Sequence, residues 1–390
     1  MNQMSRAFDQ DLSDVLAPTE SAKGMPNAFY TDPSMYDVER GRVFDKTWVA
    51  IGFGKDVPDA GDVVPVEIMG TPLILLRDKA GAVHVYHNVC SHRGMRLVEE
   101  PAKGKTVLAC PYHAWCYGLD GALRGTPSIG GPGVNELDGF DRKEHGLKEV
   151  RSAVWMDTVF VNLSGDAEPF EVRVRPINER WKDFVGRPLF HGGEESSSEL
   201  EVACNWKLAV ENYCESYHLP WVHPGLNTYS RLEDHYHLRD TDGAQYAGQG
   251  TLVYRPIEDQ DGRVFPYLSG IDSKWSTAAE YVAMFPNVLY GAHRDHWFAM
   301  LLEPHGHNRT RERVEIWYFD EASLGDEYET LRRNNAQQWR VVFQEDIFAV
   351  EGMQRGRASP GFRGGVFSSV MDGPTHDFHR WVARKVMAGD

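Results

Sequence analysis

The sequence predicts an α+β protein with two domains, a smaller antiparallel β domain and a larger mixed domain. A chain of 390 residues is long enough to bury two hydrophobic cores. Short strands separated by turn residues fill 45–164, which indicates the β domain, and helical and strand segments share 165–390. We expect 1–44 to form an N-terminal arm with a helix that packs with the larger domain.

The composition argues against several classes of protein. A content of 42% hydrophobic and 25% charged residues is that of a globular protein. The net charge of −16, with no basic run, argues against nucleic acid or an anionic membrane surface as a partner. The apolar runs are far too short to span a membrane, and the polar residues 1–11 do not resemble a signal peptide. Five irregularly spaced cysteines do not suggest a disulfide framework, so we expect a cytoplasmic protein.

The first part of the chain shows one helix followed by short strands. Asp32 and Pro33 predict the start of a helix over 35–44. The strands expected after it are 48–53, 63–68, 73–77, 83–87, 107–110 and 159–163. The Gly- and Pro-rich run 125–141 is expected to be a surface loop.

The second part of the chain alternates helices, loops and strands. A helix is expected over 170–185 with a break at Pro176, and a polar loop over 192–199. A short helix then carries Glu211 and Glu215 one turn apart. The remaining expectations are an irregular region over 225–280, strands at 281–285, 296–302 and 313–319, and a last large helix over about 325–355.

Two motifs in the β domain each carry one cysteine and one histidine. Cys90 and His92 follow one strand, and Cys110 and His113 follow another. These side chains could bind one zinc ion, but zinc fingers usually pair cysteine with cysteine and histidine with histidine. The alternating order favours a two-iron cluster, with both cysteines on one iron and both histidines on the other. The other cysteines are expected to be buried thiols: Cys116, Cys204 and Cys214.

A second group of metal ligands is predicted around His218 and His223. Pro220 disfavours a continued regular helix, so the two histidines at this corner can converge on one point. Such a pair suits a metal with open coordination positions. Either histidine alone would more simply be a polar residue at a helix end.

The third ligand is predicted on the last helix at Asp346. This residue lies three or four positions from large apolar side chains on one stripe, and Glu345 lies off that stripe. The stripe consists of Trp339, Val342, Phe343, Val350 and Met353. A carboxylate on this face needs a cation or strong donors. A structural ion pair or a cap of a buried backbone group is the alternative.

Together these residues resemble the Rieske non-haem iron oxygenases, the family of ring-hydroxylating oxygenase alpha subunits. The motifs Cys90-Ser-His92-Arg-Gly and Cys110-Pro-Tyr-His113-Ala-Trp resemble the Rieske [2Fe–2S] motif. The resemblance implies that these four residues hold the [2Fe–2S] cluster, and that a mononuclear Fe(II) is bound by His218, His223 and Asp346. It also implies a Rieske β domain followed by a helix-grip catalytic domain, an antiparallel sheet curved around a long helix.

The resemblance gives a role to Glu215 and places Asn212 in the catalytic set. Glu215 matches a carboxylate that links an iron-ligating histidine to a cluster histidine of the neighbouring subunit, here His113. A carboxylate that accepts hydrogen bonds from both imidazoles fixes their tautomers and shortens the electron path. Most of the family has Asp at this position, and Glu is typical of the branch that oxidises carnitine, glycine betaine, choline or stachydrine. Aromatic residues over 213–297 could form a cage for a methylated cation.

The implied activity is that of a terminal oxygenase that uses O2 to hydroxylate, N-demethylate or cleave a quaternary ammonium or N-methylated compound. No Gly-x-Gly-x-x-Gly motif is evident, so NAD(P)H and flavin are expected only in a separate reductase. The resemblance also implies a homotrimer joined head to tail. The alternatives are an oxygenase or O-demethylase of aromatic compounds such as aromatic acids, and a protein that is no oxygenase, either an electron-transfer Rieske protein or a zinc-stabilised binding module.

Overall fold

A computed structural model describes residues 12–240 and 245–388, which form two units. Lys46–Ala167 make up the smaller unit, and the chain before and after it makes up the larger unit. Residues 1–11 of the expected N-terminal arm lie outside the described part. No helix among the described residues has the length and apolar character needed to cross a membrane.

The smaller unit contains three antiparallel sheets of three strands each. Their strand orders are β1(Val49–Phe53)-β9(Thr158–Asn162)-β8(Arg151–Trp155), β2(Val63–Ile68)-β3(Thr71–Arg77)-β4(Val83–His87) and β5(Val107–Ala109)-β6(Cys116–Gly118)-β7(Leu123–Gly125). Ile74, Leu76 and Tyr117 pack in one buried cluster with Cys90 and Cys110. The two cysteines of the sequence motifs therefore belong to the core of this unit.

The larger unit is built on one antiparallel sheet of eight strands. The strands are β10(Phe190–His191), β17(Thr310–Tyr318), β16(His296–Pro304), β15(Val288–Ala292), β14(Ala279–Met284), β13(Tyr246–Thr251) and β12(His235–Arg239), with β11(Ser197–Val202) also paired to β17. The two longest, β16 and β17, are almost entirely buried; β16 is largely apolar, whereas β17 also buries Glu312 and Glu315.

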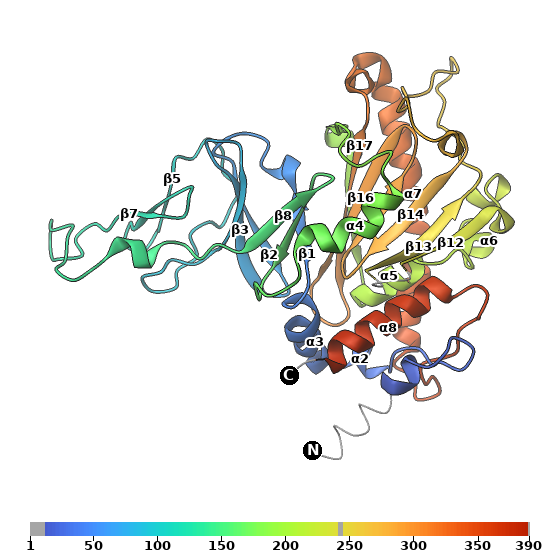
Figure 1. The fold of residues 1–390 in the computed structure, drawn as a ribbon, viewed down its shortest axis with the longest axis horizontal. Coiled ribbons are helices and arrows are strands. Elements are labelled where there is room, and N and C mark those ends of the chain that lie inside the picture. Colours follow the sequence, from blue (N-terminus) through green and yellow to red (C-terminus); the bar gives the residue numbers. More distant parts are fainter. Residues whose placement is uncertain (1–11, 241–244, 389–390) are drawn as a thin grey trace. The chain divides into compact units, whose positions relative to one another are not determined.

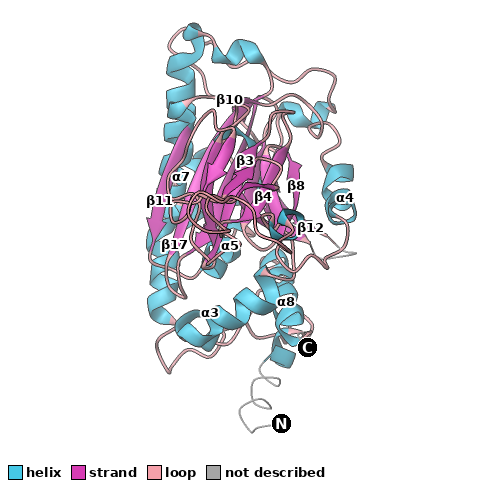
Figure 2. Cartoon of the chain, turned by 90° about the vertical axis from the view of Figure 1, so that its left-hand side faces the viewer, coloured by secondary structure: helices cyan, strands magenta, loops and turns pink. Residues whose placement is uncertain are grey.

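The larger unit also contains helices. They are α2(Ala28–Thr31), α3(Pro33–Glu39), α4(Phe170–Arg180), α5(Trp206–Tyr213), α6(Leu219–Val222), α7(Glu329–Gly356) and α8(Gly373–Met387). The long helix α7 runs along the sheet beside β11 and packs against α5 (Figures 1 and 2). Helices α2, α3 and α8 lie together at one end of the unit (Figure 1).

Several elements differ from the sequence-based expectation. Pro176 does not end its helix, because α4 continues through it to Arg180. A strand begins at Ser197 inside the expected polar loop, and β12 and β13 occupy part of the region expected to be irregular. The helix α8 follows α7, which was expected to be the last large element. The side chain of Asp32 caps α3 as predicted, by accepting from Ser34 N–H (2.9 Å).

Glu211 of α5 is a buried structural acid. Its carboxylate accepts from Tyr30 Oη (2.5 Å) and from an Arg357 guanidinium nitrogen (3.1 Å), and His379 Nε2 lies 3.2 Å away. Burial raises the pKa of Glu211, but the nearby positive groups outweigh this effect and set the pKa to about 2. This cluster ties the N-terminal arm to α5, α7 and α8.

Glu211→Gln is therefore expected to lower the stability of the larger unit by on the order of 3 kcal/mol at pH 7. Because the folded-state pKa is depressed, the carboxylate stabilises the protein above pH about 4.5 and loses this effect as the pH falls toward 2. Thermal melts of both proteins at pH 7 and pH 3 should show a large Tm difference that shrinks at pH 3. A difference of the same size at both pH values would contradict the assignment.

Candidate functional site

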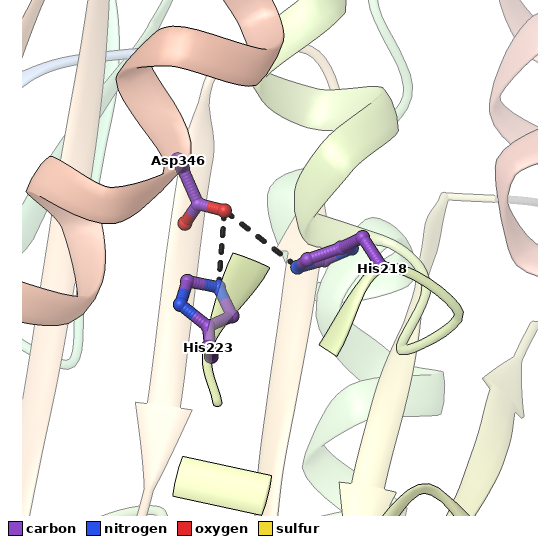
Figure 3. A group of neighbouring side chains, drawn as sticks. All are labelled: His218, His223 and Asp346. Carbon is purple, nitrogen blue, oxygen red and sulfur yellow. Dashed lines mark ion pairs between the residues drawn. The ribbon is translucent and has the colours of Figure 1, made fainter. Parts of the chain in front are cut away.

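His218, His223 and Asp346 converge in the larger unit (Figure 3). His218 directly precedes α6 and His223 directly follows it, so the short helix sets their separation. Asp346 projects from α7 toward both rings, and its Oδ1 lies 3.0 Å from His223 Nε2 and 3.6 Å from His218 Nε2. One ligand atom of each residue lies within 4.8 Å of the others. Pro220 lies in the first turn of α6, where proline is tolerated, instead of preventing a helix.

Each histidine is held by a carboxylate on the side of the ring away from Asp346. His218 Nδ1 lies 2.6 Å from Glu215 Oε1, and His223 Nδ1 lies 2.8 Å from Glu345 Oε2. A carboxylate only accepts, so each Nδ1 carries a proton, and each Nε2 offers its lone pair when a metal ion lies between it and Asp346. These hydrogen bonds therefore prepare both Nε2 atoms to bind a metal.

The carboxylate of Asp346 is also oriented. Asn212 Nδ2 donates to its Oδ1 (2.8 Å), which holds the group toward the two imidazoles. Two neutral imidazoles and one carboxylate on one side, with the other side open, are the donor set of a non-haem ferrous site. The residues present therefore fit a mononuclear iron. Asp346 is half-buried, whereas its neighbours Trp339 and Phe343 on the same stripe are buried.

Glu215 lies beyond the end of α5, in the loop that leads to His218. Its second oxygen accepts from the backbone N–H groups of Tyr217 and His218, so the carboxylate is fixed against its own turn. The side chain remains 14% exposed. Glu211 and Glu215 were expected one turn apart on one helix, but only Glu211 belongs to α5, where it faces the buried N-terminal arm.

Glu345 was missed as a member of this site. Its position off the apolar stripe agrees with its partly exposed side chain (36%), but it reaches His223 from α7. Burial lowers the pKa of His223, but the hydrogen bonds and charges of Asp346 and Glu345 outweigh burial and raise it. The sequence pointed to Glu345 only through its position directly before Asp346 on the helix.

Glu345→Gln is expected to weaken ferrous iron binding about 10- to 100-fold, because an amide is a weaker acceptor for the His223 Nδ1–H than a carboxylate. Iron titration of the metal-depleted protein measures this. Glu329→Gln, which removes an exposed ion pair with Arg333 on the same helix, is the matched control and should bind iron normally. Equal affinity in both variants would show that Glu345 does not support the ligand.

The cysteine–histidine motifs of the smaller unit adopt two equivalent turns. In each turn, the cysteine N–H donates to the carbonyl five residues later (2.8 Å for Met95 and 2.8 Å for Trp115). Gly94 and Ala114 hold the same position in these turns and both have positive φ angles, 76° and 57°. Two matching loops after β4 and β5 thus present their side chains together.

The four side chains of these loops fit an iron–sulfur cluster. Cys90 and Cys110 are buried, and the rings of His92 and His113 lie 4.7 Å apart. His113 Nδ1 is buried and accepts or donates no hydrogen bond within the described residues, so it is available as a ligand atom. Among the remaining cysteines, Cys204 and Cys214 are buried as expected, but Cys116 is only half-buried.

A cavity adjoins the metal ligands of the larger unit. His218, His223 and Asp346 belong to its lining. Its other lining includes the aromatic side chains Tyr213, Tyr229, Tyr254, Tyr281, Phe298, Trp339 and Phe343. The arrangement can hold a small organic molecule against an open metal position.

Family models match both units. The model of the ring hydroxylating alpha subunit (catalytic domain) matches residues 192–388, and that of the Rieske [2Fe-2S] domain matches residues 47–138. The chloroplastic choline monooxygenase of Arabidopsis thaliana is 29% identical over 382 residues, which cover 94% of this chain and 83% of that protein. The carnitine monooxygenase oxygenase subunit of Escherichia coli K12 is 28% identical over 356 residues, which cover 89% of this chain and 88% of that protein.

Solved structures share the fold. The quaternary ammonium Rieske monooxygenase CntA in complex with L-carnitine has a TM-score of 0.74 at 23% identity, covering 95% of this chain and 97% of that one. Naphthalene 1,2-dioxygenase from Rhodococcus sp. has a TM-score of 0.78 at 17% identity, covering 100% and 99%. The predicted α+β fold class, a Rieske domain with a ring-hydroxylase catalytic domain, is confirmed. With a catalytic-domain match over half of its length, the chain belongs to the ring hydroxylating alpha subunit family and carries a Rieske [2Fe–2S] domain before its catalytic domain.

Proposed function

We propose that this protein is the terminal oxygenase of a multicomponent system and that it oxidises a small quaternary ammonium or N-methylated compound. The observation that carries the proposal is the open side of the His218, His223 and Asp346 triad, which faces an aromatic cavity. Relatives named for choline and carnitine oxidation support this substrate class. The aromatic rings suit a methylated cation, which binds to ring faces.

The two cofactors would be held by different units. We assign the [2Fe–2S] cluster to Cys90, His92, Cys110 and His113, and the mononuclear Fe(II) to His218, His223 and Asp346. When bound, the iron supplies a site at which O2 is reduced beside the substrate. Asn212, Glu215 and Glu345 keep its ligands in the required orientation and tautomer. The larger domain is proposed to span 165–390 and the Rieske domain 45–164, with 1–44 as the arm.

The proposed reaction consumes one O2, two electrons and two protons, and it converts a C–H bond into C–OH with release of water. If the carbon is an N-methyl group, the hydroxylated product separates into formaldehyde and the demethylated amine. If the carbon lies elsewhere, C–N cleavage or simple hydroxylation results. The aromatic side chains of the cavity exclude bulk water around the substrate.

Electrons would reach the iron from a neighbouring subunit. Glu215 already accepts from His218 Nδ1 and remains partly exposed, so a carboxylate lone pair can accept from His113 of a second copy. This relay requires a head-to-tail oligomer, which we propose to be a homotrimer. A separate reductase with NAD(P)H and flavin would reduce the cluster. The five free cysteines fit a reducing, cytoplasmic location.

Oxygen uptake with a reductase tests the proposed function. The panel consists of choline, carnitine, glycine betaine, a methylated proline, a methylated pyridinium and an aromatic acid. Uptake with a methylated amine, accompanied by one organic product per O2, is expected. Productive uptake with the aromatic acid alone would favour the alternative class, an oxygenase or O-demethylase of aromatic compounds.

A further inference from the structure

A chain of hydrogen bonds lies behind two of the aromatic side chains that line the cavity. Trp339 Nε1–H donates to His296 Nε2 (2.9 Å), so the His296 proton is on Nδ1, which donates to Asp295 (2.8 Å). Tyr254 Oη–H donates to the same carboxylate, at 2.9 and 3.0 Å from its two oxygens. Tyr254 and Trp339 line the cavity, whereas Asp295 and His296 do not.

The buried carboxylate of Asp295 is therefore separated from the cavity by the side chain of Tyr254. Its side chain is 1% exposed, and within the described chain it forms no ion pair with Lys or Arg. Its neighbour Arg294 directs its guanidinium to the carbonyl of Ser276 (3.3 Å) and to the ring of Tyr267 (4.6 Å). A buried carboxylate with only neutral hydrogen-bond donors is little screened by solvent. Burial raises the pKa of Tyr254, Asp295 raises it further, and the charge of Arg294 lowers it by less.

The cavity itself offers no fixed positive charge to a ligand. No Lys or Arg is present among its described lining residues. His235 lines the cavity, but burial lowers its pKa, and its Nδ1–H is committed to Gln249 Oε1 (2.6 Å). Arg255 lies over the ring of Tyr229 (5.3 Å to the centroid) without lining the cavity.

A pocket beside the cavity carries negative charge as well. A second, more open pocket shares Leu226, Tyr229, Gln338 and Val342 with the cavity. Its other described lining includes Glu258 and Glu345 and no basic residue. The negative charge in this pocket and behind the cavity favours a cation over a carboxylate.

We propose that Asp295, acting through Tyr254, makes this cavity specific for a cationic ligand that carries no carboxylate, such as a choline-like amino alcohol. This inference rests on the proposed function and narrows its substrate class. The hydroxyl of Tyr254 and the indole N–H of Trp339 both donate hydrogen bonds to residues that do not line the cavity. This leaves the ring faces to contact an ammonium group. Trp339 lies two helical turns, about 10 Å along the axis, before Asp346 on α7, so both residues lie on one face of the helix and line the same cavity.

Calorimetric titration of the iron-loaded protein without O2 tests this inference independently of turnover. The ligands are choline, its uncharged carbon isostere 3,3-dimethylbutan-1-ol, and γ-butyrobetaine as a cation with a carboxylate. The wild-type protein is expected to bind choline at least tenfold more tightly than either of the other two. Asp295→Asn should weaken choline binding roughly tenfold and leave the isostere unchanged, since only the charge interaction is lost.

Two further variants make the result decisive. Asp272→Asn, an exposed carboxylate of the same unit, is the control and should bind all three ligands normally. If Asp295→Asn does not fold, Tyr254→Phe replaces it and should lower choline affinity alone by a few-fold. The inference is overturned if γ-butyrobetaine binds as tightly as choline, or if the variant weakens choline and its isostere equally. Failure of both choline and γ-butyrobetaine to bind would instead refute the proposed function.

Discussion

Asp346→Ala is expected to lose the mononuclear iron and all product formation while the visible spectrum of the Rieske cluster stays intact. Asp346 supplies the only carboxylate among the three converging ligand atoms. Two histidines alone bind ferrous iron weakly, because no anionic ligand balances its charge. The cluster residues belong to the other unit of the same chain, so their environment is unaffected.

Iron and sulfide assays measure this effect directly. The wild-type protein should contain about three irons and two sulfides per chain, and the variant about two of each. Glu351→Gln, on the same helix but hydrogen-bonded only to the backbone of Ala203 and paired to exposed Arg355, is the control and should retain three irons. Loss of the Rieske spectrum in Asp346→Ala would show that the two sites have been assigned wrongly.

Glu215→Gln is expected to keep both metal centres when ferrous iron is supplied at saturating concentration, although it binds the iron more weakly, and to slow product formation at least about 100-fold. Glutamine can still accept from His218 Nδ1–H, so the iron ligand keeps its tautomer. The amide carries no charge and has one acceptor oxygen in place of two. It therefore cannot accept from His218 and a cluster histidine together while also holding the backbone N–H groups of its turn.

Stopped-flow spectroscopy separates this role from a structural one. With the cluster reduced and substrate and O2 added, oxidation of the cluster should be slow in Glu215→Gln and fast in the wild-type protein and in the exposed control Glu233→Gln. Normal turnover by Glu215→Gln would show that electrons reach the iron by another route. Slow turnover accompanied by loss of iron would show that the residue only supports His218.

The sequence predicted the parts of the site that depend on local spacing. The two cysteine–histidine motifs lie in matching turns, and such turns are encoded within six residues. Helical periodicity made Asp346 a candidate, the resemblance to the family made it a predicted ligand, and the structure brings it to the two histidines, although Met353 of the same stripe is exposed. Periodicity could not reveal Glu345, since its partner His223 lies on a distant segment and approaches the less buried side of the helix.

Physical reasons also explain why the strands β12 and β13 were not predicted. The strand β12 has His, Tyr and Arg at exposed or half-buried edge positions and only Leu238 buried, so it lacks apolar alternation. Its partner β13 contains Gly248 and Gly250, which usually weaken strands; a Cβ on Gly248 would lie 2.0 Å from the Tyr281 carbonyl oxygen. The hydrogen-bonded chain through Asp295 joins three elements that meet only in the folded protein, so no local sequence pattern could predict it.

A single turnover of the fully reduced protein tests most directly the claim that this chain is an oxygenase with two coupled metal centres. The protein is reduced chemically without O2, freed of reductant, and mixed with O2 and the best substrate of the panel. One electron from the cluster and one from the ferrous iron suffice for one hydroxylation, so about one product per mononuclear iron is predicted, with oxidation of the cluster that depends on substrate. Cluster oxidation at the same rate with and without substrate, and no organic product in the reaction that contains substrate, would contradict this account.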